Sequence, residues 1–165
     1  MKRLTAMMLT ASMLLCLWGC RADAPAETQA PAATQESKAP ANMEAIYEAM
    51  ATQMPEMILM DETTMLNFCG IPADDCVQVV AAICADGLIT DEVWLIEAKD
   101  GAALEKLKSL AETRLQMKGE ESITYSPEQY AVVQEAKILT DGMYMALIVS
   151  PDVDALAEIF LNSIG

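Results

Sequence analysis

The side chains that most often perform catalysis near neutral pH are sparse in this chain of 165 residues, which contains no histidine. Histidine supplies the usual general base, the partner of serine and cysteine nucleophiles, and a common zinc ligand. The chemistry left to consider rests on cysteines, methionines and pairs of carboxylates. We therefore expect neither a cofactor nor a metal site, and a protein that is not an enzyme.

Three cysteines, Cys69, Cys76 and Cys84, lie in the part of the chain that we expect to fold. The numbers of residues between them match no zinc or iron–sulfur pattern. Cys76 and Cys84 are expected in one strand, where a rise of about 3.3 Å per residue keeps them too far apart for a disulfide. A Cys69–Cys76 disulfide, buried free thiols and a reactive thiol all remain open.

Methionines recur at a spacing of three residues in Met54, Met57 and Met60. Thioethers bind Cu(I) or line an adaptable apolar groove, and they also fill irregular cores. Because Met54 also continues the apolar side of an expected helix, we interpret these methionines chiefly as core residues.

Carboxylates occur in three adjacent pairs, which we interpret as solvated loop charges: Asp74-Asp75, Asp91-Glu92 and Glu120-Glu121. No spacing among them resembles an EF-hand loop. Glu92 and Glu97 have opposite parity in an expected strand and so point to opposite faces, which argues against a paired acid–base role. Glu97 and Lys99 are expected to form a surface pair.

The first nineteen residues, 1–19, are predicted to be a lipoprotein signal peptide. A short basic segment precedes an apolar run that is too short to cross a bilayer but suits a signal peptide. The run ends in Leu17-Trp18-Gly19-Cys20, which resembles the lipobox that lipoprotein signal peptidase recognises, although a small residue is usual in place of Trp18. We expect the Cys20 thiol to carry the membrane anchor, with acyl chains such as palmitate. Secretion after Ala24-Pro25-Ala26 and an uncleaved anchor are the alternatives.

Residues 20–41 are predicted to be a disordered tether behind the lipidated cysteine. After Cys20 they contain no aromatic residue and no Ile, Leu, Val or Met, so they bury too little apolar surface to offset the entropy of ordering. The whole chain carries a formal charge of −15. That charge argues against nucleic acid as a partner and against the domain surface itself lying on anionic lipid.

Residues 42–165 are predicted to form a single α+β domain with an antiparallel sheet of about four strands (two hairpins) and amphipathic helices packed on it. Asp141-Gly142 is the strongest hairpin signal. With a two-residue turn there, Ile138 would face Met145 and Thr140 would face Met143. The expected strands comprise residues 76–85, 92–99, 136–140 and 143–149, each with apolar residues along one side.

Five helices are predicted from apolar residues at helical spacing and from capping residues. The longest, residues 102–118, has Gly119 as its expected stop. Ser126 and Gln129 form a capping box around Pro127 at the first helical position. The five helices are expected to begin near Asn42, Asp61, Asp100, Ser126 and Ser150.

Four motifs occur in order along this domain: Asp91-Glu92-Val93 leading to Ala98-Lys99-Asp100, Tyr125-Ser126-Pro127-Glu128-Gln129, Asp141-Gly142-Met143-Tyr144, and Ser150-Pro151-Asp152. With these motifs, residues 42–162 resemble a bacterial lipoprotein family known as domain of unknown function 4358. The resemblance implies a secreted, lipid-anchored domain. It supplies no activity and no site residues.

The expected function is a non-catalytic binding or accessory module of the cell envelope, on the extracytoplasmic face of the cell membrane. Its expected partners are the membrane, through the lipid on Cys20, and an envelope protein or small ligand, but no nucleic acid. Two alternatives remain: a histidine-free enzyme that uses carboxylate or Tyr/Ser chemistry, and a structural partner in an envelope complex.

Overall fold

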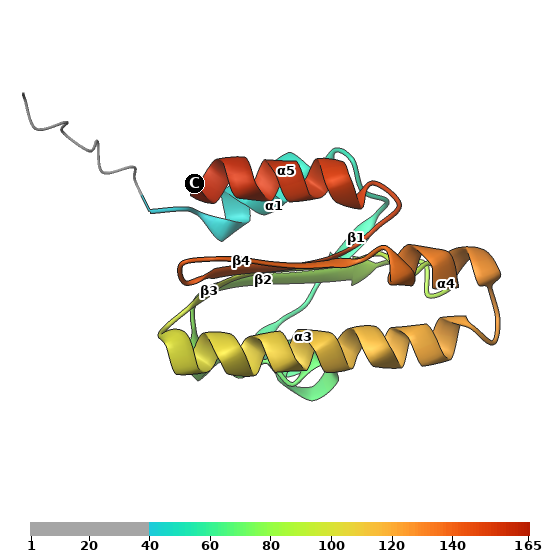
Figure 1. The fold of residues 1–165 in the computed structure, drawn as a ribbon, viewed down its shortest axis with the longest axis horizontal. Coiled ribbons are helices and arrows are strands. Elements are labelled where there is room, and N and C mark those ends of the chain that lie inside the picture. The colour runs from blue at the N-terminus through green and yellow to red at the C-terminus, as the bar shows by residue number, and fades with distance from the viewer. Residues whose placement is uncertain (1–39) are drawn as a thin grey trace, which may run out of the picture. The chain divides into compact units, whose positions relative to one another are not determined.

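The computed structural model describes residues 40–165, which form one sheet with helices on both of its faces (Figure 1). The predicted signal peptide (residues 1–19), the lipidation residue Cys20 and all but the end of the tether (residues 20–41) lie outside the described residues. Within them, no helix combines the length and the apolar character needed to cross a membrane.

The sheet contains five antiparallel strands in the order β1-β2-β3-β5-β4, which confirms the predicted α+β class and both predicted hairpins. The central strands β3 and β5 are buried on both faces, and the edge strand β1 adds a fifth strand that the sequence did not predict. The strands are β1 (Met57–Leu59), β2 (Cys76–Cys84), β3 (Glu92–Ala98), β4 (Lys137–Asp141) and β5 (Tyr144–Val149).

Helices α1 and α5 lie on one face of the sheet, and α3 lies on the other (Figure 1). The helices are α1 (Met43–Ala51), α2 (Glu62–Thr64), α3 (Gly101–Ser122), α4 (Pro127–Gln134) and α5 (Val153–Ile164). A π-helical turn, Met65–Cys69, follows α2, and a short 3-10 turn, Ala73–Asp75, precedes β2.

Four predicted caps are confirmed, because each of their side chains accepts a hydrogen bond from the backbone N–H three residues ahead. The caps are Asn42, Asp61, Asp100 and Ser126. The fifth helix, α5, differs in detail. It begins after Asp152, whose N–H donates to the Ser150 hydroxyl at 3.2 Å.

Two apolar cores lie on opposite faces of the sheet, and alternate side chains of β3 serve each of them. Trp94 and Ile96 pack toward α3, and Val93 and Leu95 pack toward α1 and α5. The core under α3 also holds Leu107, Ala111, Met145 and Leu147, and the core under α1 and α5 holds Met43, Ile46, Leu156 and Phe160.

Two predicted boundaries are wrong. Gly119 does not stop α3, which continues to Ser122, because the helix is still packed against α4 at this point. In the second hairpin Asp141 pairs with Tyr144, so Gly142 and Met143 form the turn. Gly142, with a φ of 56°, takes the first turn position, where a type II′ turn requires a positive φ.

The change of turn alters which side chains face each other across this hairpin. Ile138 faces Leu147 and Thr140 faces Met145, in place of the predicted partners Met145 and Met143. Because the register moves by two residues, every side chain keeps its predicted face of the sheet.

Candidate functional site

The three cysteines of the described residues are free thiols, so no Cys69–Cys76 disulfide is present. Cys69 Sγ donates to Met60 Sδ at 3.6 Å inside the core under α3. Burial raises the pKa of Cys69 to about 12 and the pKa of Cys76 to about 11. Since the thiolate is the nucleophilic form, neither side chain is activated for catalysis near neutral pH.

The methionine triplet does not converge on one place. Met60 belongs to the core under α3, whereas Met54 packs against the core under α1 and α5. The described residues contain no group of three or more His, Cys, Asp or Glu side chains that could hold a metal ion.

The most deeply buried charged group is Glu92, which has no exposed surface. Its carboxylate accepts from Arg114 Nη2 at 2.8 Å, from Lys118 Nζ at 3.0 Å and from Trp94 Nε1 at 2.8 Å. Arg114 and Lys118 lie one turn apart on the inner side of α3. The interpretation of Asp91-Glu92 as solvated loop charges is therefore wrong, because Glu92 is the first residue of β3 and faces the helix.

Other predicted carboxylate roles also change. Asp75 accepts from Lys99 at 2.8 Å and from Lys106 at 2.7 Å, so it is an ion-paired residue and not a solvated one. Glu97 accepts from Gln78 Nε2 at 2.7 Å, which replaces the predicted pair with Lys99. The remaining members of those pairs, Asp74, Glu120 and Glu121, are exposed as expected.

The opposite orientation of Glu92 and Glu97 is confirmed. Glu92 faces α3, whereas Glu97 bonds to Gln78, whose side chain also bonds to the backbone of Ala41 and Met43 at the start of α1. The two carboxylates therefore lie on different faces of the sheet and do not form an acid–base pair.

The hydrogen bonds around Glu92 join α3, α4 and the start of β3 into one network. Lys118 Nζ also donates to the backbone oxygen of Thr90, and the Thr90 N–H and hydroxyl both donate to Gln129 Oε1, at 2.8 and 2.9 Å. Gln129 thus binds Thr90, so the second half of the predicted capping box, its bond to the Ser126 N–H, is absent. Because Glu92, Arg114 and Lys118 are already paired with one another, we interpret this network as structural.

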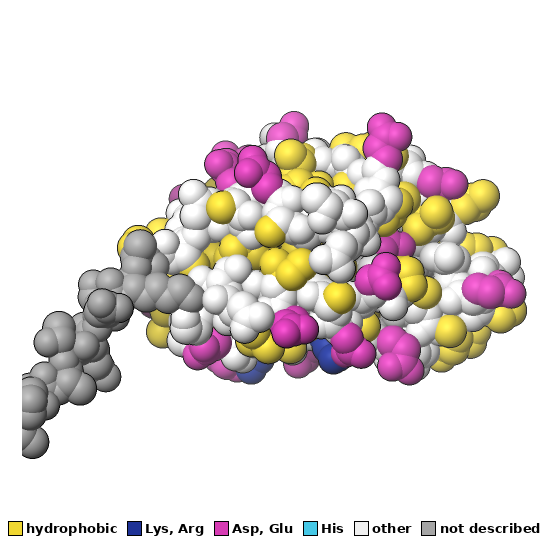
Figure 2. All heavy atoms as spheres, turned by 90° about the horizontal axis from the view of Figure 1, so that it is seen from above, with side chains coloured by type: hydrophobic (Ala, Val, Ile, Leu, Met, Phe, Trp, Pro, Cys, Tyr) yellow, Lys and Arg dark blue, Asp and Glu magenta, His cyan; other side chains and the backbone are white. Residues whose placement is uncertain are grey.

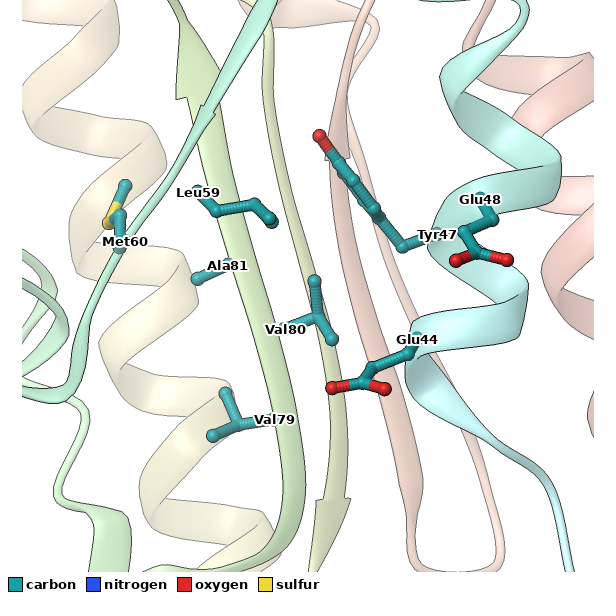
Figure 3. A pocket seen from close by; sticks show the side chains of 8 residues that line it. All are labelled: Glu44, Tyr47, Glu48, Leu59, Met60, Val79, Val80 and Ala81. Carbon is teal, nitrogen blue, oxygen red and sulfur yellow. The ribbon is translucent and has the colours of Figure 1, made fainter.

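An accessible candidate site lies between α1 and the edge of the sheet, where a hollow of about 460 Å³ opens (Figure 3). Figure 3 shows Glu44 and Tyr47 reaching from α1 toward the strands, with Val80 on the strand side opposite them. We call this hollow the edge groove. Its lining residues are Glu44, Tyr47, Glu48, Leu59, Met60, Val79, Val80 and Ala81.

The backbone of β2 is unpaired along part of the edge groove. Strand β1 pairs with Ala82–Cys84, and the Met60 N–H, just after β1, donates to the Ala81 oxygen at 2.8 Å. Cys84 N–H donates to the Asp91 oxygen at 2.9 Å, and hydrogen-bonded pairs alternate along an antiparallel ladder. Val79, opposite Ile96, therefore points its N–H and C=O away from β3, and neither group has a partner among the described residues.

The edge groove has acidic walls. Glu44 and Glu48 are exposed on α1, and burial raises the pKa of the Tyr47 hydroxyl between them. Figure 2 views the molecule from the side of α1 and α5, and shows acidic side chains spread over this face with few Lys or Arg side chains. This site was not predicted from the sequence, because β1 was not expected. The one available signal was the short apolar run after Pro55, Met57–Leu59.

Comparison with known proteins identifies a family to which this chain is similar. The model of a family described as "Domain of unknown function (DUF4358)" matches residues 50–150, which is more than half of the chain. The matched stretch includes all five strands with α2, α3 and α4, whereas α5 and most of α1 lie outside it. No curated protein and no solved structure matches the chain.

Proposed function

The chain belongs to this family of domains of unknown function, DUF4358, and we propose that it is a non-catalytic binding module of the cell envelope. In this proposal the lipid on Cys20 holds it at the extracytoplasmic face of the cell membrane. The edge groove then binds an extended segment of another envelope protein. The observation that supports this function is the open backbone edge at Val79 beside an acidic helix.

Binding by strand addition follows from the groups in the edge groove. A peptide in extended conformation can bond to the Val79 N–H and C=O, as other domains bind peptides at open sheet edges. Its alternate side chains would meet Tyr47 and Val80 on one side. Glu44 and Glu48 favour Lys or Arg in the peptide and disfavour acidic segments, a second copy of this acidic chain among them.

The buried groups support binding over catalysis. Glu92 is held by Arg114 and Lys118, and the thiols of Cys69 and Cys76 are kept protonated by burial. A histidine-free enzyme remains the alternative proposal. It would need convergent carboxylates or an activated hydroxyl in an open cleft, and the edge groove offers Glu44 and Glu48 on one helix only.

The test uses the full-length chain in mild detergent and two fluorescent peptides in which charged residues alternate with valine. The basic peptide is Lys-Val-Lys-Val-Lys, and the acidic peptide is Glu-Val-Glu-Val-Glu. Fluorescence anisotropy should show that the basic peptide binds and the acidic peptide does not. The affinity for the basic peptide should fall as the salt concentration rises. The double variant Glu44→Gln with Glu48→Gln should weaken binding about tenfold. Glu112→Gln with Glu120→Gln removes two charges from α3, on the opposite face, and should leave binding unchanged.

A second variant tests the backbone contact. Val79→Pro removes an N–H that points away from β3, a position where an edge strand tolerates proline. Circular dichroism should show a folded chain that no longer binds the basic peptide. Equal binding of both peptides, or binding that survives both the Glu44/Glu48 variant and Val79→Pro, would show that the edge groove is not the binding site.

A further inference from the structure

A second hollow, of about 250 Å³, lies at the opposite end of the strands from the β4–β5 turn, where the chain enters β3 and leaves β5. Asp91 precedes β3, and Ser150 and Asp152 follow β5. Apolar walls come from Pro55, after α1, and from Val132 of α4. We call this hollow the Asp91 pocket. It is separate from the edge groove, and the two share no lining residue.

Asp91 carries an unused acceptor. The residue is 4% exposed, and its Oδ2 atom is the one buried side-chain nitrogen or oxygen among the described residues that has no hydrogen-bond partner. Buried polar atoms in native proteins are nearly always paired, so an orphan carboxylate oxygen beside a hollow points to a missing partner. Burial raises the pKa of Asp91, opposed by hydrogen bonding from Ser150 and by the charge of Lys118.

The charges around the Asp91 pocket leave room for a cation. On the α3 side, Glu92 pairs with Arg114 and Lys118, and Lys118 also donates to the Thr90 oxygen. Asp91 and Asp152 then add two carboxylates. The two charged residues that line the Asp91 pocket are thus both acidic.

We propose that the Asp91 pocket binds the primary ammonium group of a small alkylamine. The ammonium would donate to the Asp91 carboxylate, Asp152 would add negative charge at the exposed side, and the methylene groups would contact Pro55, Ile89 and Val132. The mixture of two carboxylates with apolar walls suits an alkylammonium ion better than a metal ion, which needs more convergent oxygen ligands. A hollow of about 250 Å³ is smaller than the pockets that usually hold drug-sized molecules, so the ligand must be smaller than these.

Titration of the full-length chain in mild detergent tests this proposal with n-butylamine as the probe and n-butanol as its neutral analogue. At pH 7, butylamine should raise the melting temperature progressively with concentration, and butanol at the same concentrations should not. Asp91→Asn keeps the side-chain shape and should weaken butylamine binding at least about tenfold, because a charge-assisted bond is lost. Asp74→Asn, at an exposed carboxylate, is the matched control and should bind as the unsubstituted chain does.

Additional measurements identify the source of the amine and distinguish lost binding from a folding defect. A short acetylated peptide with one lysine, compared with its norleucine analogue, distinguishes a lysyl side chain from a free amine. Asp152→Asn, at an exposed position, should weaken binding two- to threefold without a change in folding. Glu44→Gln with Glu48→Gln should leave butylamine binding intact, so that failure of the edge groove does not affect this result.

Three outcomes would overturn the proposal. One is an equal response to butylamine and butanol. Another is unchanged butylamine affinity in both Asp91→Asn and Asp152→Asn. The third is a thermal shift with calcium chloride, abolished by Asp91→Asn, in a chain that does not respond to butylamine.

Discussion

Glu92 is fully buried and pairs with both Arg114 and Lys118. Whether this carboxylate stabilises or destabilises the fold therefore depends on both cations. Removing a carboxylate from water is unfavourable unless good geometry and several hydrogen bonds compensate for it. Here both oxygens of Glu92 are engaged, and Arg114 also lies over the Phe68 ring, 4.3 Å from its centroid. This network fixes α3 on the sheet.

Glu92→Gln should lower the free energy of unfolding by about 3–5 kcal/mol, because Arg114 and Lys118 would stay buried without their counter-charge. Urea denaturation of the full-length chain in mild detergent measures the effect. Glu105→Gln, in the exposed pair of Glu105 with Lys108, is the matched control and should change stability by less than about 0.5 kcal/mol. Equal losses in the two variants would refute the structural role of Glu92.

The buried thiol of Cys69 and the half-buried thiol of Cys76 give a prediction that depends on pH. Folding raises the pKa of Cys69 to about 12 and of Cys76 to about 11, so both favour the native state below their unfolded pKa and lose that contribution as pH rises through the alkaline range. At pH 8, N-ethylmaleimide should leave both side chains unmodified in the native chain. Peptide mapping by mass spectrometry should find both modified in guanidinium chloride. Rapid native labelling of Cys69 would contradict its position in the core.

The sequence predicted the free thiols as one of three possibilities but missed the burial of Glu92, and the reason is physical. Adjacent acids are usually solvated, and nothing local in Asp91-Glu92 distinguishes the exception. The available signal lay on α3, where Arg114 and Lys118 continue the buried stripe of Leu107 and Ala111. Cations on an inner helix face require a buried anion opposite them.

At the scale of elements, capping chemistry was the most predictable feature, since a cap acts within four residues. Strand pairing was less predictable. Strand β1 has three residues and forms only against the edge of β2, so its formation depends on tertiary contacts that its sequence does not contain. The hairpin at Gly142 was placed correctly but with the wrong turn, because the Asp-Gly pattern leaves open which two residues form the turn.

Ser126→Ala should lower the free energy of unfolding by about 0.5–2 kcal/mol, because the hydroxyl that accepts from the Gln129 N–H at 3.2 Å caps α4. Ser109→Ala is the comparison, since Ser109 lies exposed within α3 and its hydroxyl donates to the Glu105 backbone oxygen of the same helix. It should change stability by less than about 0.5 kcal/mol. Denaturant melts of the two variants decide between a capping role and none.

For the whole molecule, the arrangement of layers explains how an acidic domain stays folded. Most charged side chains lie at the surface, the buried Glu92 is paired with Arg114 and Lys118, and two separate apolar cores stabilise the two faces of the sheet. Acidic side chains are spread over the face of α1 and α5 (Figure 2), and α1 borders the open edge of β2 at the edge groove. A lipid tether at the N-terminus would keep such a domain near a membrane whose anionic headgroups repel its surface.

The lipid anchor that we propose on Cys20 gives the last prediction. Two acyl chains bind a bilayer stably at about 0.8 kcal/mol per buried CH₂, whereas one chain is marginal. The chain isolated from native membranes should therefore begin at Cys20 and carry the mass of a diacylglycerol, and Cys20→Ala should remove both the lipid and the cleavage. Cys16→Ala, four residues earlier, is the matched control and should be processed normally. A diacylglycerol-free N-terminus at Glu27 in intact-mass measurements would instead establish secretion after Ala26.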